Sequence, residues 1–339
     1  MGIKGLFGRG LFKAGSGAIA TLALSAAMTA RAFADDVKQT LGQPTDKAMG
    51  WQLAGSDLKE KTEWFYNDLL FPVITVICLF VLALLVWIVI RYNKKSNPVP
   101  AKFSHNTLIE IVWTVVPVLI LVVIAIFSLG LLRDYNNMPK PDVVVKATGN
   151  QWFWTYDFPE LGVTDVESRL REDAKDVKTA EKAGVPYLLE VDNPLIVPVN
   201  KVVHVQTTGA DVIHSFTIPA FGFKIDAIPG RLNNTWFKAK KIGTYYGQCS
   251  ELCGKDHAYM PIEIKVVSEA DFDAYIIAQG GKTRAMLASE AAASAAAAEQ
   301  AAAAAAQSAE ASAPAAEASS SAATSASATP AGNGAAAAH

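Results

Sequence analysis

Four side chains that could bind a soft metal ion are closely spaced near residue 255. Cys249, Cys253, His257 and Met260 form the pattern C-x3-C-x3-H-x2-M. Thiolate, imidazole and thioether groups are soft to borderline ligands, and together they select copper over magnesium or calcium. The pattern therefore predicts a copper site built largely from one loop.

A second histidine is available for this site. His214 lies in the sequence D-V-I-H-S-F, well before Cys249. A single-copper electron-transfer site uses one cysteine, two histidines and a weak methionine, so two cysteines exceed that set. The ligands fit two copper ions bridged by both sulfurs, each ion with one histidine and one weak axial ligand. Met260 would be one axial ligand, and a backbone carbonyl inside the cysteine loop could be the other.

Two other interpretations of these residues stay open. The two cysteines could form a disulfide in an oxidising compartment, but the adjacent histidine and methionine would then be unexplained. A structural zinc ion could use two cysteines and two histidines, although zinc has little use for a thioether. The remaining cysteine, Cys78, lies in an apolar run, and His204 lies in an alternating segment. We interpret Cys78 as a packing residue and His204 as a strand histidine whose hydrogen bonds are satisfied, rather than as metal ligands.

The cysteine loop lies among short segments rich in β-branched and aromatic residues. Proline and glycine separate these segments, which is typical of a β-sandwich or a Greek-key barrel. The charged segment 164–183 lacks strand alternation, so we expect a surface insertion that could be helical. The expected strands are 143–147, 152–158, 187–191, 201–207, 236–239, 244–247 and 262–267.

Two apolar runs precede the strands. Residues 69–90 and 111–132 carry no charged side chain, and each exceeds the ~20 residues that a membrane-spanning helix needs. Cytoplasmic loops are enriched in lysine and arginine, so we expect the connecting loop in the cytoplasm. Residues 35–68 and the domain 133–284 then lie on the opposite, extracytoplasmic side of the membrane. The basic residues of the loop are Arg91, Lys94, Lys95 and Lys102.

The two ends of the chain have distinctive compositions. Residues 1–34 combine a basic start, a short apolar stretch and an A-x-A site, which is the pattern of a cleaved bacterial export signal. The mature chain would then begin near Asp35. Alanine dominates residues 285–339, where proline and serine favour a disordered tail.

The charge of the chain argues against a nucleic-acid partner. Thirty basic and 32 acidic residues give a formal net charge of −2, without the basic excess that phosphate contacts need. Residues 1–34 hold four basic residues and no acidic ones, so cleavage would leave 26 against 32 and a charge of −6. Since the cytoplasmic loop is basic, the exported parts are acidic and suit a basic partner.

Four motifs, in this order, give the chain a clear resemblance to a known family. They are 151–154 (Q-W-F-W), 211–216, 226–231 (D-A-I-P-G-R) and the cysteine loop 249–261. The chain resembles subunit II of haem–copper cytochrome c oxidases over roughly residues 50–280. The resemblance implies a membrane-anchored all-β protein, in which a two-helix transmembrane hairpin precedes a cupredoxin-like Greek-key β-sandwich.

The resemblance also implies the dinuclear copper centre called CuA. By motif, Cys249 and Cys253 bridge the two copper ions, and His214 and Met260 complete one of them. His257 and the backbone carbonyl of Glu251 complete the other. The Glu251 carboxylate would also reach a magnesium ion shared with subunit I.

The family resemblance implies an electron-accepting subunit. Reduced cytochrome c would dock at Asp157 and Asp211, and electrons would enter at Trp152, for which core packing is the alternative. They would pass to subunit I, where O2 is reduced to water with proton pumping. Glu110 matches the acid at the mouth of the proton-uptake channel, although a carboxylate also suits a helix start.

Other functions compete with this one. A membrane-anchored copper-delivery thiol protein could use C-x3-C and a distal histidine, but such proteins are usually thioredoxin-like with one anchor. A quinol oxidase subunit II shares the architecture and lacks the copper ligands, while nitrous oxide reductase shares the copper loop and lacks the helix pair. The sequence contains no C-x-x-C-H haem-attachment motif, so the cytochrome donor would be a separate protein.

Overall fold

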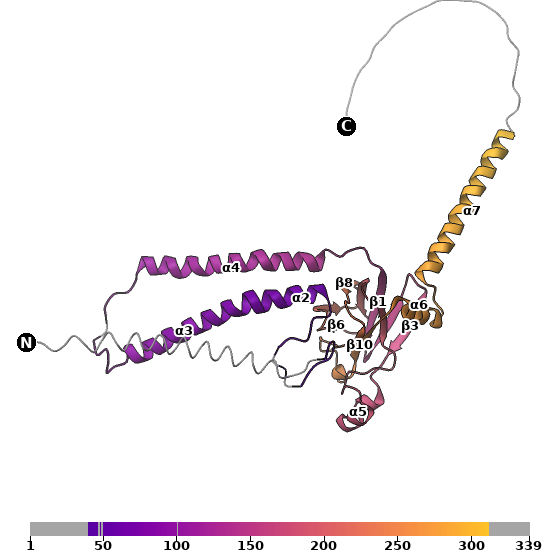
Figure 1. Cartoon of the computed structure of the whole chain (residues 1–339). Coiled ribbons are helices and arrows are strands. Elements are labelled where there is room, and N and C mark those ends of the chain that lie inside the picture. Colours follow the sequence, from indigo (N-terminus) through magenta and orange to yellow (C-terminus); the bar gives the residue numbers. More distant parts are fainter. Residues whose placement is uncertain (1–39, 47, 49, 100, 312–339) are drawn as a thin grey trace, which may run out of the picture. The chain divides into compact units, whose positions relative to one another are not determined.

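The computed structural model describes residues 40–46, 48, 50–99 and 101–311 (Figure 1). The expected signal sequence, 1–34, lies outside the described residues. The chain divides into two units, Met1–Arg284 and Ala285–His339, and the first contains the helices and strands that position the candidate site.

Two long apolar helices come first. One continuous helix comprises α2 (Asp57–Trp64), the π-helical segment η1 (Phe65–Leu70) and α3 (Phe71–Arg91). The other is α4 (Thr107–Asn136). Asn106 caps its start, because the Asn106 side chain accepts a hydrogen bond from the Ile109 N–H. Both are long and apolar enough to cross a membrane, with mean hydropathy values of 3.3 and 3.1. The two predicted apolar helices are confirmed.

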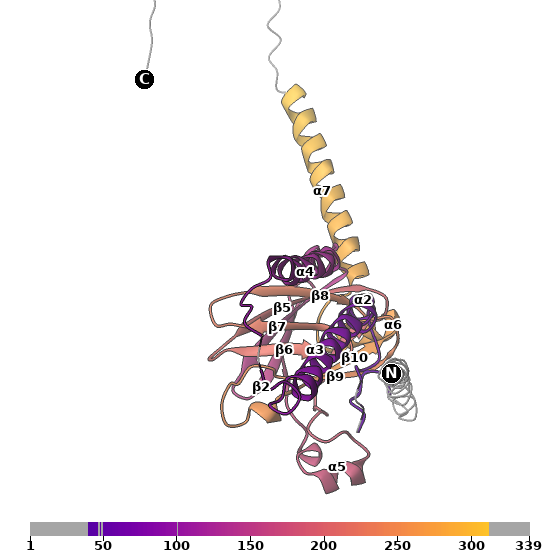
Figure 2. The ribbon, with the colours of Figure 1, turned by 90° about the vertical axis from the view of Figure 1, so that its left-hand side faces the viewer.

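The part that follows is built from strands in three groups, which Figure 2 shows gathered in one body. One sheet has the order β3-β2-β1-β5-β8, a second has the order β4-β10-β9, and β6 and β7 form a hairpin. The strands are β1 (Val143–Asn150), β2 (Phe153–Phe158), β3 (Val163–Ser168), β4 (Leu195–Pro198), β5 (Val202–Gly209), β6 (His214–Ile218), β7 (Phe223–Ala227), β8 (Asn233–Lys238), β9 (Gly243–Gln248) and β10 (Pro261–Val267).

Aromatic rings fill the space between the β6–β7 hairpin and the five-stranded sheet. The Phe216 ring lies 5.2 Å from that of Trp154 at an interplanar angle of 88°. Phe223 stacks on Phe237 of β8 at 5.6 Å. These side chains are buried because alternate residues of each strand face inward. The expected β-sandwich is confirmed.

One expected strand, 187–191, is wrong. These residues form a turn with a single bridge between Val191 and Leu170. Leu188 has a positive φ of 58°, and its N–H donates to the carbonyl of Ala174. Pro186 has no N–H to give to a sheet. The β-type composition of this segment reflects its contacts with the insertion that precedes it.

The insertion expected at 164–183 is partly a strand. Its first residues belong to β3, which pairs with β2 at the edge of the five-stranded sheet. A short 3-10 helix (Glu172–Ala174) and α5 (Val177–Ala183) follow. The charged residues of β3 alternate poorly because an edge strand exposes much of its length to solvent.

The alanine-rich tail also differs from expectation. After α6 (Glu269–Ala278), a helix α7 extends over Arg284–Ala311, where disorder was expected. Alanine has the highest helix propensity, and the first proline after Arg284 is Pro314. Propensity alone therefore suffices for helix here without an apolar stripe. Residues 312–339 lie outside the described part of the chain.

Hydrogen bonds join the apolar helices to the turn between β6 and β7. The N–H of Gly55 donates to Ala220 O at 2.7 Å, and Ser56 Oγ donates to Phe221 O at 2.7 Å. Tyr135, near the end of α4, donates its hydroxyl to Gly222 O at 2.7 Å. Three successive carbonyls of one turn thus hold the start of the first helix and the end of the second.

Candidate metal centre

The candidate site lies in the loop between β9 and β10. This loop contains a short 3-10 helix (His257–Tyr259) and returns the chain to the start of β10. Its cysteine end is attached to β6, because the Ser250 N–H donates to the carbonyl of Ser215 at 3.0 Å. His214, the first residue of β6, is therefore brought beside the loop.

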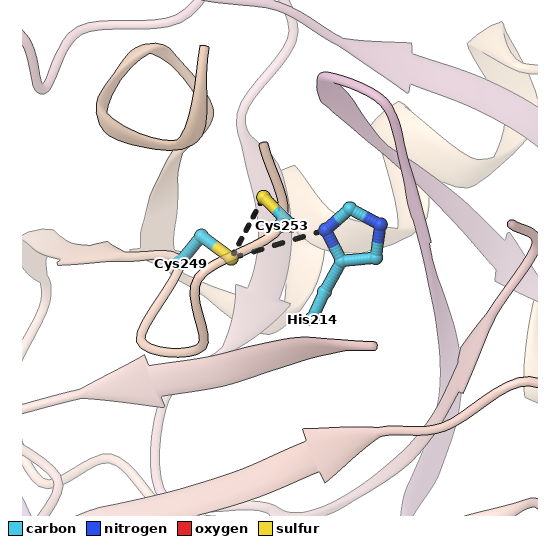
Figure 3. Close-up of side chains that lie close together, drawn as sticks. All are labelled: His214, Cys249 and Cys253. Atoms are coloured by element: carbon cyan, nitrogen blue, oxygen red, sulfur yellow. Dashed lines mark hydrogen bonds between the residues drawn. The ribbon is translucent and has the colours of Figure 1, made fainter. Parts of the chain in front are cut away.

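The sulfur atoms of Cys249 and Cys253 face each other at the centre of the site (Figure 3). They are 3.9 Å apart, and both cysteines are free. Nδ1 of His214 lies 3.9 Å from the Cys249 sulfur, and the three ligand atoms all lie within 4.8 Å of one another. Since a disulfide needs about 2.05 Å between its sulfurs, the disulfide interpretation is not the arrangement found here.

The other predicted ligands complete the same cluster. His257 Nδ1 and Met260 Sδ each lie 3.5 Å from the Cys253 sulfur. The carbonyl oxygen of Glu251 lies 3.4 Å from the sulfur of Cys249. All six positions singled out from the sequence therefore meet, with Glu251 represented by its backbone, since its side chain is exposed.

Burial, hydrogen bonds and the charge of the neighbouring sulfur shift the pKa values of the two thiols. Burial raises the pKa of Cys249, but hydrogen bonds involving His214 and the Ser215 backbone outweigh it and bring the value to about 7. Burial, together with the charge of Cys249, raises the pKa of Cys253 to about 12. Two thiolates at this distance thus need a cation between them. The donor set of two sulfurs, two imidazoles and a thioether fits copper.

Asp211 positions His214. Its Oδ1 accepts a hydrogen bond from His214 Nε2 at 2.9 Å, and its Oδ2 accepts one from the Gln151 N–H at 2.7 Å. With Nε2 engaged, Nδ1 is left to face the cysteines. The sequence interpretation missed this role, although the D-x-x-H spacing carries a signal for it. The docking role predicted for Asp211 stays a prediction.

Asp157, the other predicted docking acid, lies apart from the cluster. Its side chain is 15% exposed and forms an ion pair with Lys146 at 3.2 Å. It also accepts a hydrogen bond from the Asp165 N–H. This carboxylate is therefore largely committed to β1 and β3, and its docking role also stays a prediction.

Trp152 contacts the cluster through the backbone. Its indole Nε1 donates to the carbonyl oxygen of Cys253 at 3.2 Å, and the Gln151 side chain donates to the same oxygen at 3.0 Å. The ring is half-buried and lines a cavity of about 520 Å³ together with Arg169 and Asp256. Trp152 therefore joins an open surface to a cysteine of the site.

Two further residues support the ligands from inside. Trp154 is fully buried and donates Nε1 to the carbonyl of Met260 at 3.3 Å, which agrees with its interpretation as a packing residue. Gly149 lies against the imidazole of His214. A Cβ at this position would lie 2.7 Å from the ring carbon Cγ, so only glycine leaves the space.

Glu110 is remote from this cluster. It lies in the first turn of α4 and accepts a hydrogen bond from the Asn106 N–H at 3.4 Å. That is the position of a helix-capping carboxylate, and its role in proton uptake stays a prediction.

Comparison with known proteins identifies the family. Residues 143–267 match the model for the cytochrome c oxidase subunit II periplasmic domain, and residues 44–131 match the model for its transmembrane domain. The probable cytochrome c oxidase subunit 2 of Rickettsia bellii is 47% identical over 234 residues, covering 69% of this chain and 85% of that protein. The chain belongs to the cytochrome c oxidase subunit II family.

The similarity to a second curated relative agrees with this assignment. Cytochrome c oxidase subunit 2 of Cereibacter sphaeroides is 42% identical over 268 residues, covering 75% of this chain and 88% of that protein. The crystallised periplasmic domain of subunit II from Bradyrhizobium japonicum is 55% identical, covering 42% of this chain and 96% of that domain, with a TM-score of 0.38.

Family membership gives the site its context. The chain is a membrane-anchored subunit of an oxidase complex with an exposed β-sandwich domain. In this family subunit II receives electrons at a copper centre, and the buried group of His214, Cys249 and Cys253 is consistent with copper binding.

We predict that Asp211→Ala weakens copper binding, because His214 loses the partner that fixes its ring. The expected loss is roughly 10- to 100-fold in affinity, as for other residues that orient metal ligands. Copper retention against a competing chelator measures it on the full chain. Asp157→Ala is the matched control and should keep wild-type affinity, while Asp211→Asn, which keeps an acceptor oxygen, should lie between the two. Equal affinity of all variants would show that Asp211 does not position His214.

Proposed function

We propose that this chain accepts electrons from reduced cytochrome c at a dinuclear copper centre and passes them to subunit I. The observation that carries the proposal is the convergence of six donors, four of them on buried residues and two of them facing sulfurs 3.9 Å apart. Copper bound there supplies a one-electron acceptor whose charge two metal ions share. In subunit I, which holds the haem, O2 is reduced to water with proton pumping.

The ligands divide between the two ions. Cys249 and Cys253 would hold both ions, His214 and Met260 would complete the ligands of one, and His257 with the Glu251 carbonyl would complete those of the other. The contacts of 3.4–3.9 Å around the two sulfurs support this set. The start of β6 and the loop that joins β9 to β10 hold the ligands, so their geometry should change little when the charge changes, and electron transfer needs little reorganisation. The exposed carboxylate of Glu251 is free to hold a magnesium ion shared with subunit I.

Electrons enter at Trp152, whose indole is hydrogen-bonded to the carbonyl of Cys253. Cytochrome c presents lysines, and Asp157 and Asp211 contribute negative charge to the surface on which it docks. The donor face is mixed, however, because the Lys255 ammonium lies 5.6 Å from the Trp152 ring centroid. The docking rate should therefore depend only moderately on salt.

The protein is placed in the bacterial cytoplasmic membrane, with the copper domain and both mature termini on the periplasmic side. The loop 91–110, which carries four basic residues, is cytoplasmic. Residues 1–34 are cleaved, and residues 35–68 form an extracytoplasmic segment. Residues 69–132 form the transmembrane hairpin, and residues 133–284 form the copper domain. Glu110, at the cytoplasmic end of α4, stands at the entrance of a proton path into subunit I.

Copper content and electron paramagnetic resonance of the full chain in detergent test the proposed centre. We expect two copper ions per chain and one unpaired electron that couples equally to both copper nuclei. Cys249→Ser should abolish this signal because a bridging sulfur is removed, whereas Cys78→Ser, in α3, should preserve it. A single-copper spectrum, or unchanged copper in Cys249→Ser, would refute a dinuclear centre.

Trp152→Phe should slow electron arrival from reduced cytochrome c while leaving the copper content unchanged. Phenylalanine keeps a ring but loses the N–H bond to Cys253, and we expect a decrease of about tenfold or more. Stopped-flow absorbance of the copper-loaded chain measures the rate. Trp236→Phe, which loses a bond to Tyr135 instead, is the control. Equal rates of electron transfer in the two variants would show that Trp152 is a packing residue and not the entry point for electrons.

Glu110→Gln should reduce turnover of the assembled oxidase at saturating cytochrome c and leave the copper spectrum intact. Glutamine preserves the acceptor for the Asn106 N–H but cannot titrate, so helix capping is separated from proton uptake. Oxygen consumption measures turnover. Wild-type turnover in Glu110→Gln would remove the proton role.

A further inference from the structure

Three aromatic side chains surround a cavity at the outer end of the first apolar helix. The cavity measures about 400 Å³ and is lined by Gly50, Trp51, Tyr66, Asn67 and Phe71. The rings of Trp51 and Tyr66 lie 5.2 Å apart at an interplanar angle of 88°, and those of Tyr66 and Phe71 lie 6.2 Å apart. None of the lining side chains carries a formal charge.

The cavity is built by two separate segments. Gly50 and Trp51 precede α2, whereas Tyr66 and Asn67 belong to η1, the π-helical segment that joins α2 to α3 (Figure 1). Phe71 is the first residue of α3, where the apolar run begins. Tryptophan and tyrosine at this level of a spanning helix lie among lipid headgroups. The cavity therefore opens where a bilayer presents its polar surface.

A cation already lies on one of these rings. Nζ of Lys59 is 4.2 Å from the ring centroid of Trp51, and the lysine is only 2% exposed. Glu63 lies 3.6 Å from the same nitrogen, so the ion pair adds no net charge beside the cavity. The Trp51 ring thus already attracts one cation, and the pairing of Lys59 with Glu63 limits the repulsion that this lysine exerts on a second cation at the cavity.

From these observations we infer that the cavity binds the ammonium headgroup of a zwitterionic phospholipid of the outer leaflet. Aromatic walls recognise choline and ethanolamine through the attraction between a cation and a ring face. Asn67 adds one neutral amide for the headgroup's polar atoms. The inference is independent of the copper centre, so a failure of one proposal would not affect the other.

The chain offers a control for ordinary interfacial aromatics. Trp64 lies in the last turn of α2, is 51% exposed, and contacts the ring of Phe127 at 5.7 Å without lining the cavity. If any tryptophan near the membrane surface retained lipid, Trp64 would contribute as much as Trp51. A site at the cavity requires that only Trp51 matters.

Native mass spectrometry of the full chain in detergent tests the site, with dioleoyl phosphatidylcholine, phosphatidylethanolamine or phosphatidylglycerol added separately. We expect one retained choline or ethanolamine lipid, and weak retention of the anionic glycerol lipid. Trp51→Ala should lower the occupancy by about fivefold or more, in line with one lost cation–ring contact. Trp64→Ala should match the wild type. Trp51→Phe, which keeps a ring, should retain most of the lipid, and it serves as the probe if the alanine variant does not fold.

Four outcomes would overturn the inference. Equal losses in Trp51→Ala and Trp64→Ala would assign retention to the general interfacial belt. Equal retention of the glycerol lipid would show that the ammonium group is not recognised. Displacement of bound lipid by soluble glycine betaine would make a soluble quaternary amine the ligand. Absence of any retained lipid in the wild type would remove the site altogether.

Discussion

The close approach of two buried, unbonded sulfur atoms is the constraint on which the site depends. Cys249 and Cys253 lie 3.9 Å apart, and each is at most 5% exposed. The two thiols cannot both ionise cheaply at this distance, because burial and the first negative charge oppose the second. Because the scaffold holds the two sulfurs close together without a bond, it favours the binding of a cation between them. The surrounding hydrogen bonds serve to keep that arrangement.

Hydrogen bonds from side chains to backbone carbonyls help to maintain the arrangement. The carbonyl of Cys253 accepts hydrogen bonds from Gln151 and Trp152, and the carbonyl of Met260 accepts one from Trp154. The segment that follows β1 therefore holds the cysteine loop at two points. Such bonds fix the ligands in position without adding charge, so the site can gain or lose an electron with little rearrangement of its neighbours.

The sequence predicts which metal-binding side chains cluster far better than it predicts what orients them. Four of these donors fall within twelve residues, and their chemistry is specific, so their spacing alone indicates that they meet. Asp211 differs, because a surface aspartate and a histidine-orienting aspartate look alike until β6 places His214 beside it. The wrong strand at 187–191 has a similar origin, since a positive φ at Leu188 depends on the neighbouring insertion. In the tail, the high helix propensity of alanine favours the helix found at Arg284–Ala311.

The β6–β7 hairpin connects the membrane anchor to the metal centre. Its turn supplies the carbonyls of Ala220, Phe221 and Gly222 to the apolar helices and the segment before them, while His214 stands at the opposite end of β6. Each of these hydrogen bonds contributes about 1 kcal/mol, whereas the exposed ion pairs of Lys240 nearby add little and weaken with salt. Because β6 has only five residues, the distance between the β6–β7 turn and His214 can vary little. The position of His214 relative to the membrane is therefore set by a short, stiff strand anchored through its turn. A rigid connection of this kind suits a protein whose electron must reach a partner subunit at a fixed distance.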